Sequence, residues 1–237
     1  NATAADKKAA TDTVDSYDPA TVTSSDKAAI ESALDTIEDL LDTKHLTGAE
    51  RDALEDAKAE AEALLDAIDE ATKAADTDNT AKVEDVTADN VTPEDKSDLE
   101  KAKDDLEDAL EKNGGNYTEE EKKAIEDEIK RIEDALETLE NVEAIEDAIS
   151  DLPTTVEPDD EETVAKIEEA KKAYDELTDY EKSLVDEKVK EKLDKLTAAA
   201  VAYDIVKGDG GKWSKGTTSG LSFTVNGPIS KFISVEI

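Results

Sequence analysis

The stretch Val22-Thr-Ser-Ser-Asp26-Lys27 recurs roughly 70 residues later as Val91-Thr-Pro-Glu-Asp95-Lys96, and more loosely as Val156-Glu-Pro-Asp-Asp160. A second phrase keeps step with it: Thr47-Gly-Ala-Glu-Arg-Asp-Ala-Leu54, Thr118-Glu-Glu-Glu-Lys-Lys-Ala-Ile125 and Thr178-Asp-Tyr-Glu-Lys-Ser-Leu-Val185. Self-similarity at a nearly constant period indicates one structural unit used repeatedly. The sequence therefore predicts an array that holds or presents something.

Within each repeat, apolar residues recur every three or four positions, which places them on one face of a helix. A further helical element precedes each such pair, about Ala4–Tyr17 in the first repeat and Val142–Leu152 in the third. The latter continues from the preceding helix through Asn141 without a breaking residue, so we expect one long shared helix. The paired helices carry Ile30, Ala33, Leu34, Ile37 and Leu41; Leu54, Ala61, Leu65 and Ile68; Leu99, Ala102, Leu106 and Leu110; Ile125, Ile129, Ile132, Leu136 and Leu139; Val164, Ile167, Tyr174 and Leu177; Val185, Val189, Leu193 and Leu196.

Five of the six paired helices begin with a capping box, in which a threonine caps the helix and an acid three residues later binds back to it. The sixth, at Glu157-Pro158-Asp159, places acids at the positive end of the helix dipole instead. Asp76-Thr-Asp-Asn-Thr80 interrupts the pattern, so we expect a flexible joint there. The five boxes are Thr23 with Asp26, Thr47 with Glu50, Thr92 with Asp95, Thr118 with Glu121 and Thr178 with Glu181.

These patterns predict a mainly α-helical protein built of tandem three-helix modules that form an elongated rod. Residues 1–75 are expected to be the first module, 76–140 the second and 141–202 the third. Modules of this size are near the lower limit for a self-sufficient core, so we expect each to depend on its neighbours.

From residue 203 the composition changes, because glycines cluster and acids become rare. Leu221, Phe223 and Val225 alternate with polar residues, which is typical of β-strands, and Tyr203–Val206 would form another strand. Residues 203–237 are too few for a complete β-sandwich. We expect either the beginning of a truncated module or a module completed by strand pairing with another chain.

The chain carries 28 Lys and Arg against 65 Asp and Glu, a net charge of −37. Such a surface disfavours binding to nucleic acid and to anionic membranes, and no apolar segment is long enough to predict membrane insertion. There is no Cys, which excludes disulfides, thiolate nucleophiles and cysteine-containing zinc sites. The first residue is Asn1 and no signal peptide is present, so we interpret the sequence as a piece of a larger protein.

Residues 144–200 resemble the three-helix FIVAR modules (found in various architectures) on Ile149…Leu152-Pro153, Ala170…Ala173-Tyr174…Leu177-Thr178 and Glu181-Lys182…Leu184-Val185. The first two repeats share the plan but lack the Ala-Tyr-x-x-Leu-Thr core. The tail, with Tyr203-Asp-Ile-Val, Trp213-Ser-Lys-Gly and Leu221-Ser-Phe-Thr, is similar to the opening of X2-like immunoglobulin-type modules. These resemblances imply an extracellular setting on a Gram-positive cell wall and a spacer or presentation role. Neither supplies catalytic residues.

Individual residues give few candidates for a chemical site. His45 is the single histidine and is expected in an interhelical loop, without an acid–base partner. Asp76, Asp78 and Asn79 resemble a calcium loop, but its glycine and final glutamate are missing. Trp213, near Phe223 and Phe232, is the one candidate ligand contact, as a sugar-stacking residue.

Two further motifs have plain structural interpretations. The acidic run Asp159-Asp-Glu-Glu162 lies at a helix start, where neighbouring carboxylates do not face each other across a cleft. Leu152-Pro-Thr-Thr155 resembles the start of a sortase signal, but it lacks the glycine, apolar tail and basic end. We interpret it as a helix stop.

We therefore expect no enzyme, no catalytic residues, no metal and no cofactor. The leading hypothesis is a structural spacer of a bacterial cell-surface or secreted protein, whose partners are its neighbouring domains. One alternative is an adhesin-type module that binds a host protein, immunoglobulin or albumin, on a helical face. Another is glycan binding through the C-terminal β segment.

Overall fold

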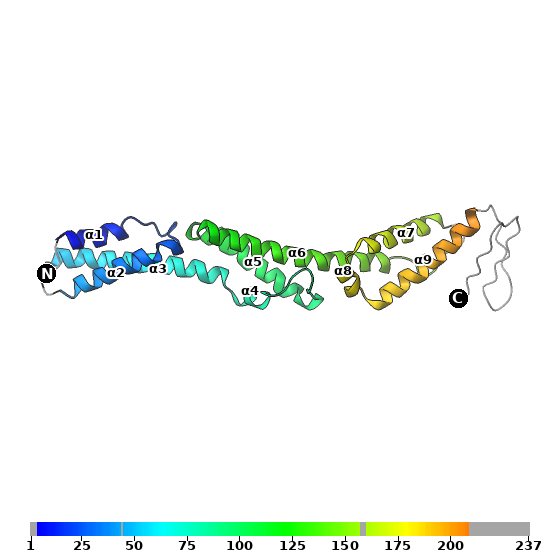
Figure 1. The fold of residues 1–237 in the computed structure, drawn as a ribbon, viewed down its shortest axis with the longest axis horizontal. Coiled ribbons are helices and arrows are strands. Elements are labelled where there is room, and N and C mark those ends of the chain that lie inside the picture. The colour runs from blue at the N-terminus through cyan, green and yellow to red at the C-terminus, as the bar shows by residue number, and fades with distance from the viewer. Residues whose placement is uncertain (1–3, 44, 157–159, 209–237) are drawn as a thin grey trace. The chain divides into compact units, whose positions relative to one another are not determined.

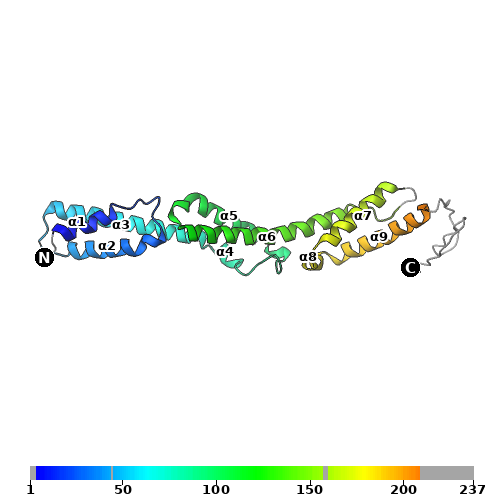
Figure 2. The same cartoon turned by 45° about the horizontal axis from the view of Figure 1, so that its top comes forward.

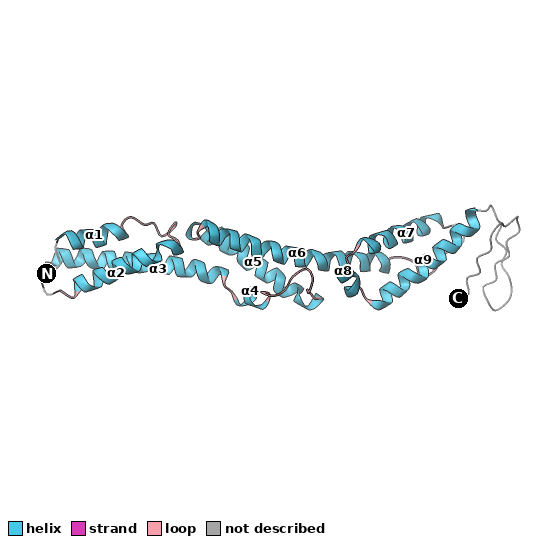
Figure 3. Ribbon diagram, in the orientation of Figure 1, coloured by secondary structure: helices cyan, strands magenta, loops and turns pink. Residues whose placement is uncertain are grey.

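The computed structural model describes residues 4–43, 45–156 and 160–208, and over these residues the protein is mainly α-helical, without strands (Figures 1 and 3). Short 3-10 turns lie at Ser24–Asp26, Pro93–Asp95 and Gly114–Asn116. The α-helices are α1 Ala4–Val14, α2 Lys27–Leu41, α3 Gly48–Ala75, α4 Asp78–Lys82, α5 Lys96–Asn113, α6 Glu119–Ser150, α7 Glu161–Glu176, α8 Asp179–Leu184 and α9 Glu187–Gly208.

The chain divides into two compact units, Asn1–Thr138 and Leu139–Ile237. Helix α6 has residues in both, because it continues through Asn141 to Ser150 without interruption. The predicted long helix shared by the second and third repeats is therefore confirmed. No breaker occurs between its two apolar segments, so helix propagation is not interrupted.

In the first unit, α1, α2 and α3 pack side by side around one apolar core (Figures 1 and 2). The apolar stripe of α2 contributes Ile30 and Ile37, both 0% exposed, and α3 contributes Leu54 and Leu64. Burial of a side chain of this size stabilises the fold by about 1.5–3 kcal/mol. Helix α3 also packs against α5, and α4 packs against α5, so α3 serves two groups of helices.

In the second unit, the C-terminal part of α6 packs with α7 and α9 around a separate core. Ile149 and Ile167 are fully buried there, and Leu193 and Leu196 of α9 are almost so. Lys192 closes the end of α6, because its Nζ donates to the carbonyl oxygens of Ser150 (2.8 Å) and Leu152 (2.5 Å). A cation at a helix C-terminus satisfies carbonyls that have no partner within the helix.

All five predicted capping boxes are present. In each, the threonine N–H donates to the carboxylate of the acid three residues later, at 2.7–3.0 Å. At Thr23 and Thr92 the box begins a 3-10 turn that leads into α2 or α5. Helix α7, for which no box was predicted, is capped by Asp160, whose Oδ1 accepts the Thr163 N–H at 3.0 Å.

The predicted interruption of the helical pattern at Asp76–Thr80 is confirmed, because α3 ends at Ala75 and a new short helix, α4, begins at Asp78. The flexibility of this joint stays a prediction. Thr77 caps the short helix α4, and its N–H donates to Thr80 Oγ1 at 2.9 Å. The Thr80 side chain is buried. A threonine three residues after another can supply part of the reciprocal bonding of a capping box, so this run of turn-forming residues also begins a helix.

The helix predicted from Thr178 through Leu196 is divided in the structure. Helix α8 ends at Leu184, Val185 is buried with an extended ψ of 133°, and α9 begins at Glu187. The Asp186 N–H donates to Glu146 Oε1 of α6 at 2.6 Å, while Asp186 Oδ1 accepts the Lys188 N–H at 2.8 Å. The break is therefore stabilised by a long-range bond and a new N-terminal cap, which the apolar spacing alone does not reveal.

The predicted strand at Tyr203–Val206 is also wrong, because α9 continues to Gly208. The preceding Thr197-Ala-Ala-Ala-Val-Ala202 contains strong helix formers, and a growing helix adds residues at low cost until a breaker is met. The remaining predicted β residues, 209–237, lie outside the described residues.

Glu50 provides a test of the capping boxes. Its carboxylate accepts the Thr47 N–H (2.8 Å) and, from α1, the Lys7 ammonium (2.9 Å). These bonds, that of the Thr47 N–H first, lower the pKa of Glu50 from 4.5 to about 2. A lowered folded-state pKa means that the stabilisation is present above the unfolded pKa and is lost as the pH falls through the folded value.

We predict that Glu50→Gln lowers the melting temperature at about pH 7, and that the difference from the wild type shrinks from about pH 4.5 and nearly vanishes at about pH 2. Thermal unfolding followed by circular dichroism measures this. Glu60→Gln, an exposed position on the same helix, is the matched control. A Glu50→Gln difference that stays constant over this pH range would contradict the prediction.

Candidate functional site

Within the part of the chain that the structure describes, the residues that the sequence offered for chemistry do not converge on a site. His45 is exposed in the loop between α2 and α3. Trp213, the predicted ligand contact, lies outside the described residues, as do Phe223 and Phe232. In the described part of the chain, no group of three or more acidic or histidine side chains is arranged to hold a metal ion.

The polar residues that resembled a calcium loop bind a neighbouring helix instead. Asn79 Nδ2 and Thr77 Oγ1 both donate to Asp105 Oδ2 of α5, at 2.9 and 2.8 Å. These two bonds attach the start of α4 to α5. The cluster therefore has a structural role in which the carboxylate accepts protein hydrogen bonds.

The acidic run and the sortase-like motif also have local structural roles. Asp160 is the N-cap of α7, and its hydrogen bonds with Thr163, from the side chain first, lower its pKa. Asp159 lies outside the described residues. Leu152 is buried just beyond the end of α6, in agreement with its interpretation as a helix stop. None of the described helices combines the length and the apolar character that spanning a bilayer requires.

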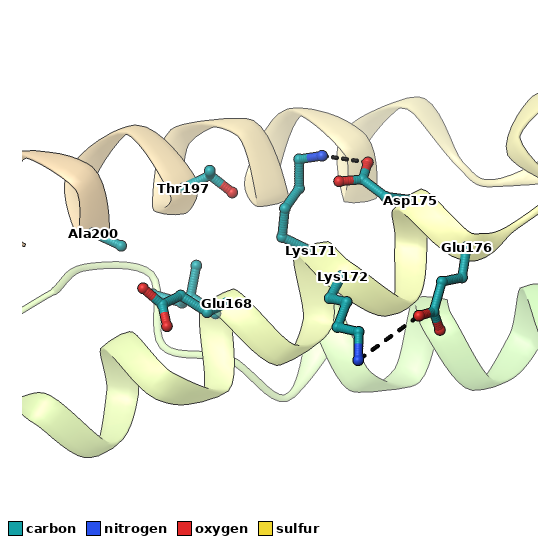
Figure 4. A pocket seen from close by; sticks show the side chains of 8 residues that line it. Glu168, Lys171, Lys172, Asp175, Glu176, Thr197 and Ala200 are labelled. Carbon is teal, nitrogen blue, oxygen red and sulfur yellow. Dashed lines mark hydrogen bonds and ion pairs between the residues drawn. The ribbon is translucent and has the colours of Figure 1, made fainter.

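A hollow of about 390 Å³ lies between α7 and α9 in the second unit (Figure 4). Its floor includes Ile167 and Ala200, which are 0% and 4% exposed. Thr197 Oγ1 is buried beside them without a hydrogen-bond partner in the described structure. The hollow exists because α9 presents small side chains opposite α7.

Four of the charged side chains around this hollow form two ion pairs, and Glu168 is a further exposed carboxylate beside it. Lys171 binds Asp175, and Lys172 lies 3.8 Å from Glu176, each pair along one face of α7 (Figure 4). Pairs of this spacing on an exposed helix are worth about 0.3–0.5 kcal/mol. The arrangement contains the Thr197 hydroxyl, two ion pairs and the Glu168 carboxylate, but the hydroxyl has no hydrogen bond to a base that would activate it.

The most specific geometry in the described structure is a contact between the first and second repeats, within the first unit. We call it the inter-repeat contact: Gly115, Asn116 and Tyr117 of the second repeat against the loop Asp18–Val22 and α3 of the first. Asn116 Nδ2 donates to the carbonyl oxygens of Pro19 (2.8 Å) and Val22 (2.9 Å). Both amide hydrogens are thus used to hold one loop.

Tyr117 attaches the same segment to α3. It is 5% exposed, and its hydroxyl donates to the Ala71 carbonyl oxygen at 2.5 Å. Burial, together with the charge of Glu121, raises the pKa of the phenol above its ordinary value. The hydroxyl therefore remains protonated and available as a donor throughout the neutral range.

Glu121, the acid of the second repeat's capping box, also binds the first repeat. It is partly buried and has hydrogen bonds with Ser24 of the first repeat and with Thr118 of its own box. Burial alone would raise its pKa, but these hydrogen bonds outweigh burial and hold the pKa below its ordinary value. The charged form is therefore the one that the contact stabilises.

Gly115 permits the close approach of the two repeats. A Cβ atom at this position would lie 2.1 Å from the Ala20 carbonyl oxygen, whereas one at Gly114 would meet nothing within 4 Å. The apolar spacing and the capping motifs do not predict this contact. Its signal was the segment Asn113-Gly-Gly-Asn-Tyr117, whose glycines are unusual in the helical part of the chain.

Comparison with known proteins adds no relatives: no family model, no curated protein and no solved structure matches the chain.

The two adjacent glycines make a matched pair for testing the contact. We predict that Gly115→Ala lowers the free energy of unfolding by about 1–3 kcal/mol, because backbone must move to admit the methyl group. Gly114→Ala should change it by less than about 0.5 kcal/mol, or raise it slightly, because the space is open and alanine restricts the unfolded chain. Urea unfolding followed by circular dichroism measures both, and equal effects of the two substitutions would refute the assigned geometry.

Proposed function

We propose that the chain is a non-enzymatic spacer of a bacterial cell-surface or secreted protein, built of tandem three-helix modules in an elongated rod. The observation that carries this proposal is the inter-repeat contact. It consists of directional hydrogen bonds and a close backbone approach, which fix the position of one repeat on the next. A spacer requires this property because a defined length depends on defined joints.

The helices themselves give a second argument. Helix α3 packs against both α2 and α5, so consecutive groups of helices are joined by a shared helix as well as by a loop. A linker of flexible residues would leave the distance between neighbouring domains variable. The proposed partners are accordingly the neighbouring domains of a larger protein, in an extracellular, Gram-positive setting as the FIVAR resemblance implies.

The host-protein-binding alternative has less support. Protein-binding surfaces are usually centred on exposed aromatic or apolar anchors. Of the tyrosines whose side chains the structure describes, Tyr117 is buried and Tyr17, Tyr174 and Tyr180 are half-buried. Tyr174 packs on its own core, and Lys171 and Lys182 lie 6.0 and 5.9 Å from its ring centroid.

Small-angle scattering tests the spacer proposal. A compact globule of this length has a radius of gyration of about 18 Å. We predict a clearly larger value and a single molar mass by light scattering at about 0.15 M salt, where screening limits the effect of repulsion among the acids. A radius near that of the globule would overturn the proposal.

A fixed distance between two points of the chain can be measured separately from the radius of gyration. Because the chain contains no Cys, two introduced cysteines can be labelled without competition, one at Ala9 in α1 and one at Asp127 in α6. Single-molecule energy transfer should give one narrow distance distribution, and Gly115→Ala should broaden it. A wide distribution in the otherwise unchanged chain would contradict a spacer of fixed length.

A further inference from the structure

Two loops in the first unit have the same backbone hydrogen bonding. In Asp18–Val22, the N–H groups of residues 21 and 22 both donate to the Asp18 carbonyl oxygen, at 2.9 Å. In Thr87–Val91, those of residues 90 and 91 both donate to the Thr87 carbonyl oxygen, at 3.1 and 2.9 Å. Each loop ends in a buried valine, Val22 or Val91, so the loop is a recurring part of the repeat.

One carbonyl oxygen at the same position of each loop, that of Pro19 or Ala88, accepts a hydrogen bond from a later segment. Asn116 binds those of Pro19 and Val22 in the first loop. In the second loop, the Ala88 carbonyl oxygen lies 3.4 Å from Thr138 Oγ1 of α6, a hydroxyl that it shares with the Asp134 carbonyl oxygen at 3.3 Å. The repeat thus supplies an acceptor loop, while the Gly-Asn-Tyr donor segment occurs in the second repeat.

The inter-repeat contact lies beside the apolar core of α1–α3 and connects it to α5 and the first part of α6, whose buried side chains include Leu99, Leu106 and Ile132. Tyr117 binds α3 at Ala71, which is 1% exposed and close in sequence to the core residue Ile68. Asn116 binds the loop that leads into α2 through the capping box of Thr23. Unfolding of the α1–α3 core would therefore remove the carbonyl oxygens that Asn116 and Tyr117 bind. The buried Tyr117 hydroxyl would then have no acceptor.

We propose that the inter-repeat contact makes α1–α3 and α5, with the first part of α6, unfold as one cooperative unit. In repeat proteins, stability is approximately a sum of intrinsic repeat terms and nearest-neighbour interface terms. Repeats this small have weak intrinsic terms, so the interface decides whether neighbours open together. This inference concerns folding alone, and it stands whether or not the chain is a spacer.

Hydrogen exchange on the full chain tests the coupling with a perturbation placed far from the contact. Ile37 is fully buried in the core of α1–α3. Ile37→Val should speed the slowest-exchanging amides of α2 by about two- to tenfold, as removal of one buried methyl group does. In a cooperative unit, the slowest amides of α5 speed up by the same factor.

Repeating Ile37→Val in a variant that lacks the donors of the inter-repeat contact shows whether those donors carry the coupling between α2 and α5. When Asn116→Ala and Tyr117→Phe are present, Ile37→Val should still speed the α2 amides, while its effect on the α5 amides falls clearly below its effect on α2, leaving only the part that the packing of α3 on α5 carries. Tyr17→Phe is the control variant, because it removes a tyrosine hydroxyl from the first repeat outside the inter-repeat contact. When Ile37→Val is added to this control, the α2 and α5 amides should still speed up together.

Either of two results would overturn the proposal. If the exchange rates of the α5 amides do not change with Ile37→Val in the otherwise unchanged chain, the two groups of helices open independently. This measurement does not require the Asn116→Ala, Tyr117→Phe double variant to fold. If the α5 amides respond equally with and without Asn116→Ala and Tyr117→Phe, the two groups of helices are coupled by something other than the inter-repeat contact.

Discussion

Most of the described structure depends on the hydrogen bonds of one carboxylate, that of the glutamate three residues after the threonine in each Thr-x-x-Glu capping box. It binds the threonine N–H at the start of a helix and also takes one partner from elsewhere. That partner is Lys7 for Glu50, Ser24 for Glu121 and Asn141 for Glu181. One residue therefore begins a helix and attaches it to another part of the chain.

Glu181 is a buried carboxylate that hydrogen bonds keep in its charged form. It is 7% exposed, and burial alone would raise its pKa. Its hydrogen bonds from the Thr178 N–H and from Asn141 outweigh burial and hold its pKa below the ordinary value. A buried carboxylate is tolerated only when such donors satisfy it, so the position of α8 on α6 is specified by the donors as well as by apolar packing.

The sequence predicted what depends on residues close together in the chain. All five capping boxes and the uninterrupted helix through Asn141 follow from spacings of a few residues. The division between α8 and α9 did not, because it depends on Glu146, some 40 residues from Asp186. The inter-repeat contact was missed for the same reason: Asn116 and Pro19 are 97 residues apart, and no local pattern encodes their meeting.

Repulsion among the many carboxylates destabilises this fold, so other interactions must supply its stability. Ion pairs between helices are present, such as Lys27 with Asp69 and Lys103 with Glu133, but they are partly exposed, and such pairs contribute little. With 65 acids and 28 basic residues, most carboxylates have no cation available and repel one another. Stability must therefore come from the apolar stripes, the caps and the contacts between repeats. The acids keep the outer faces of the helices in water, and their mutual repulsion disfavours any collapse of one acidic face onto another.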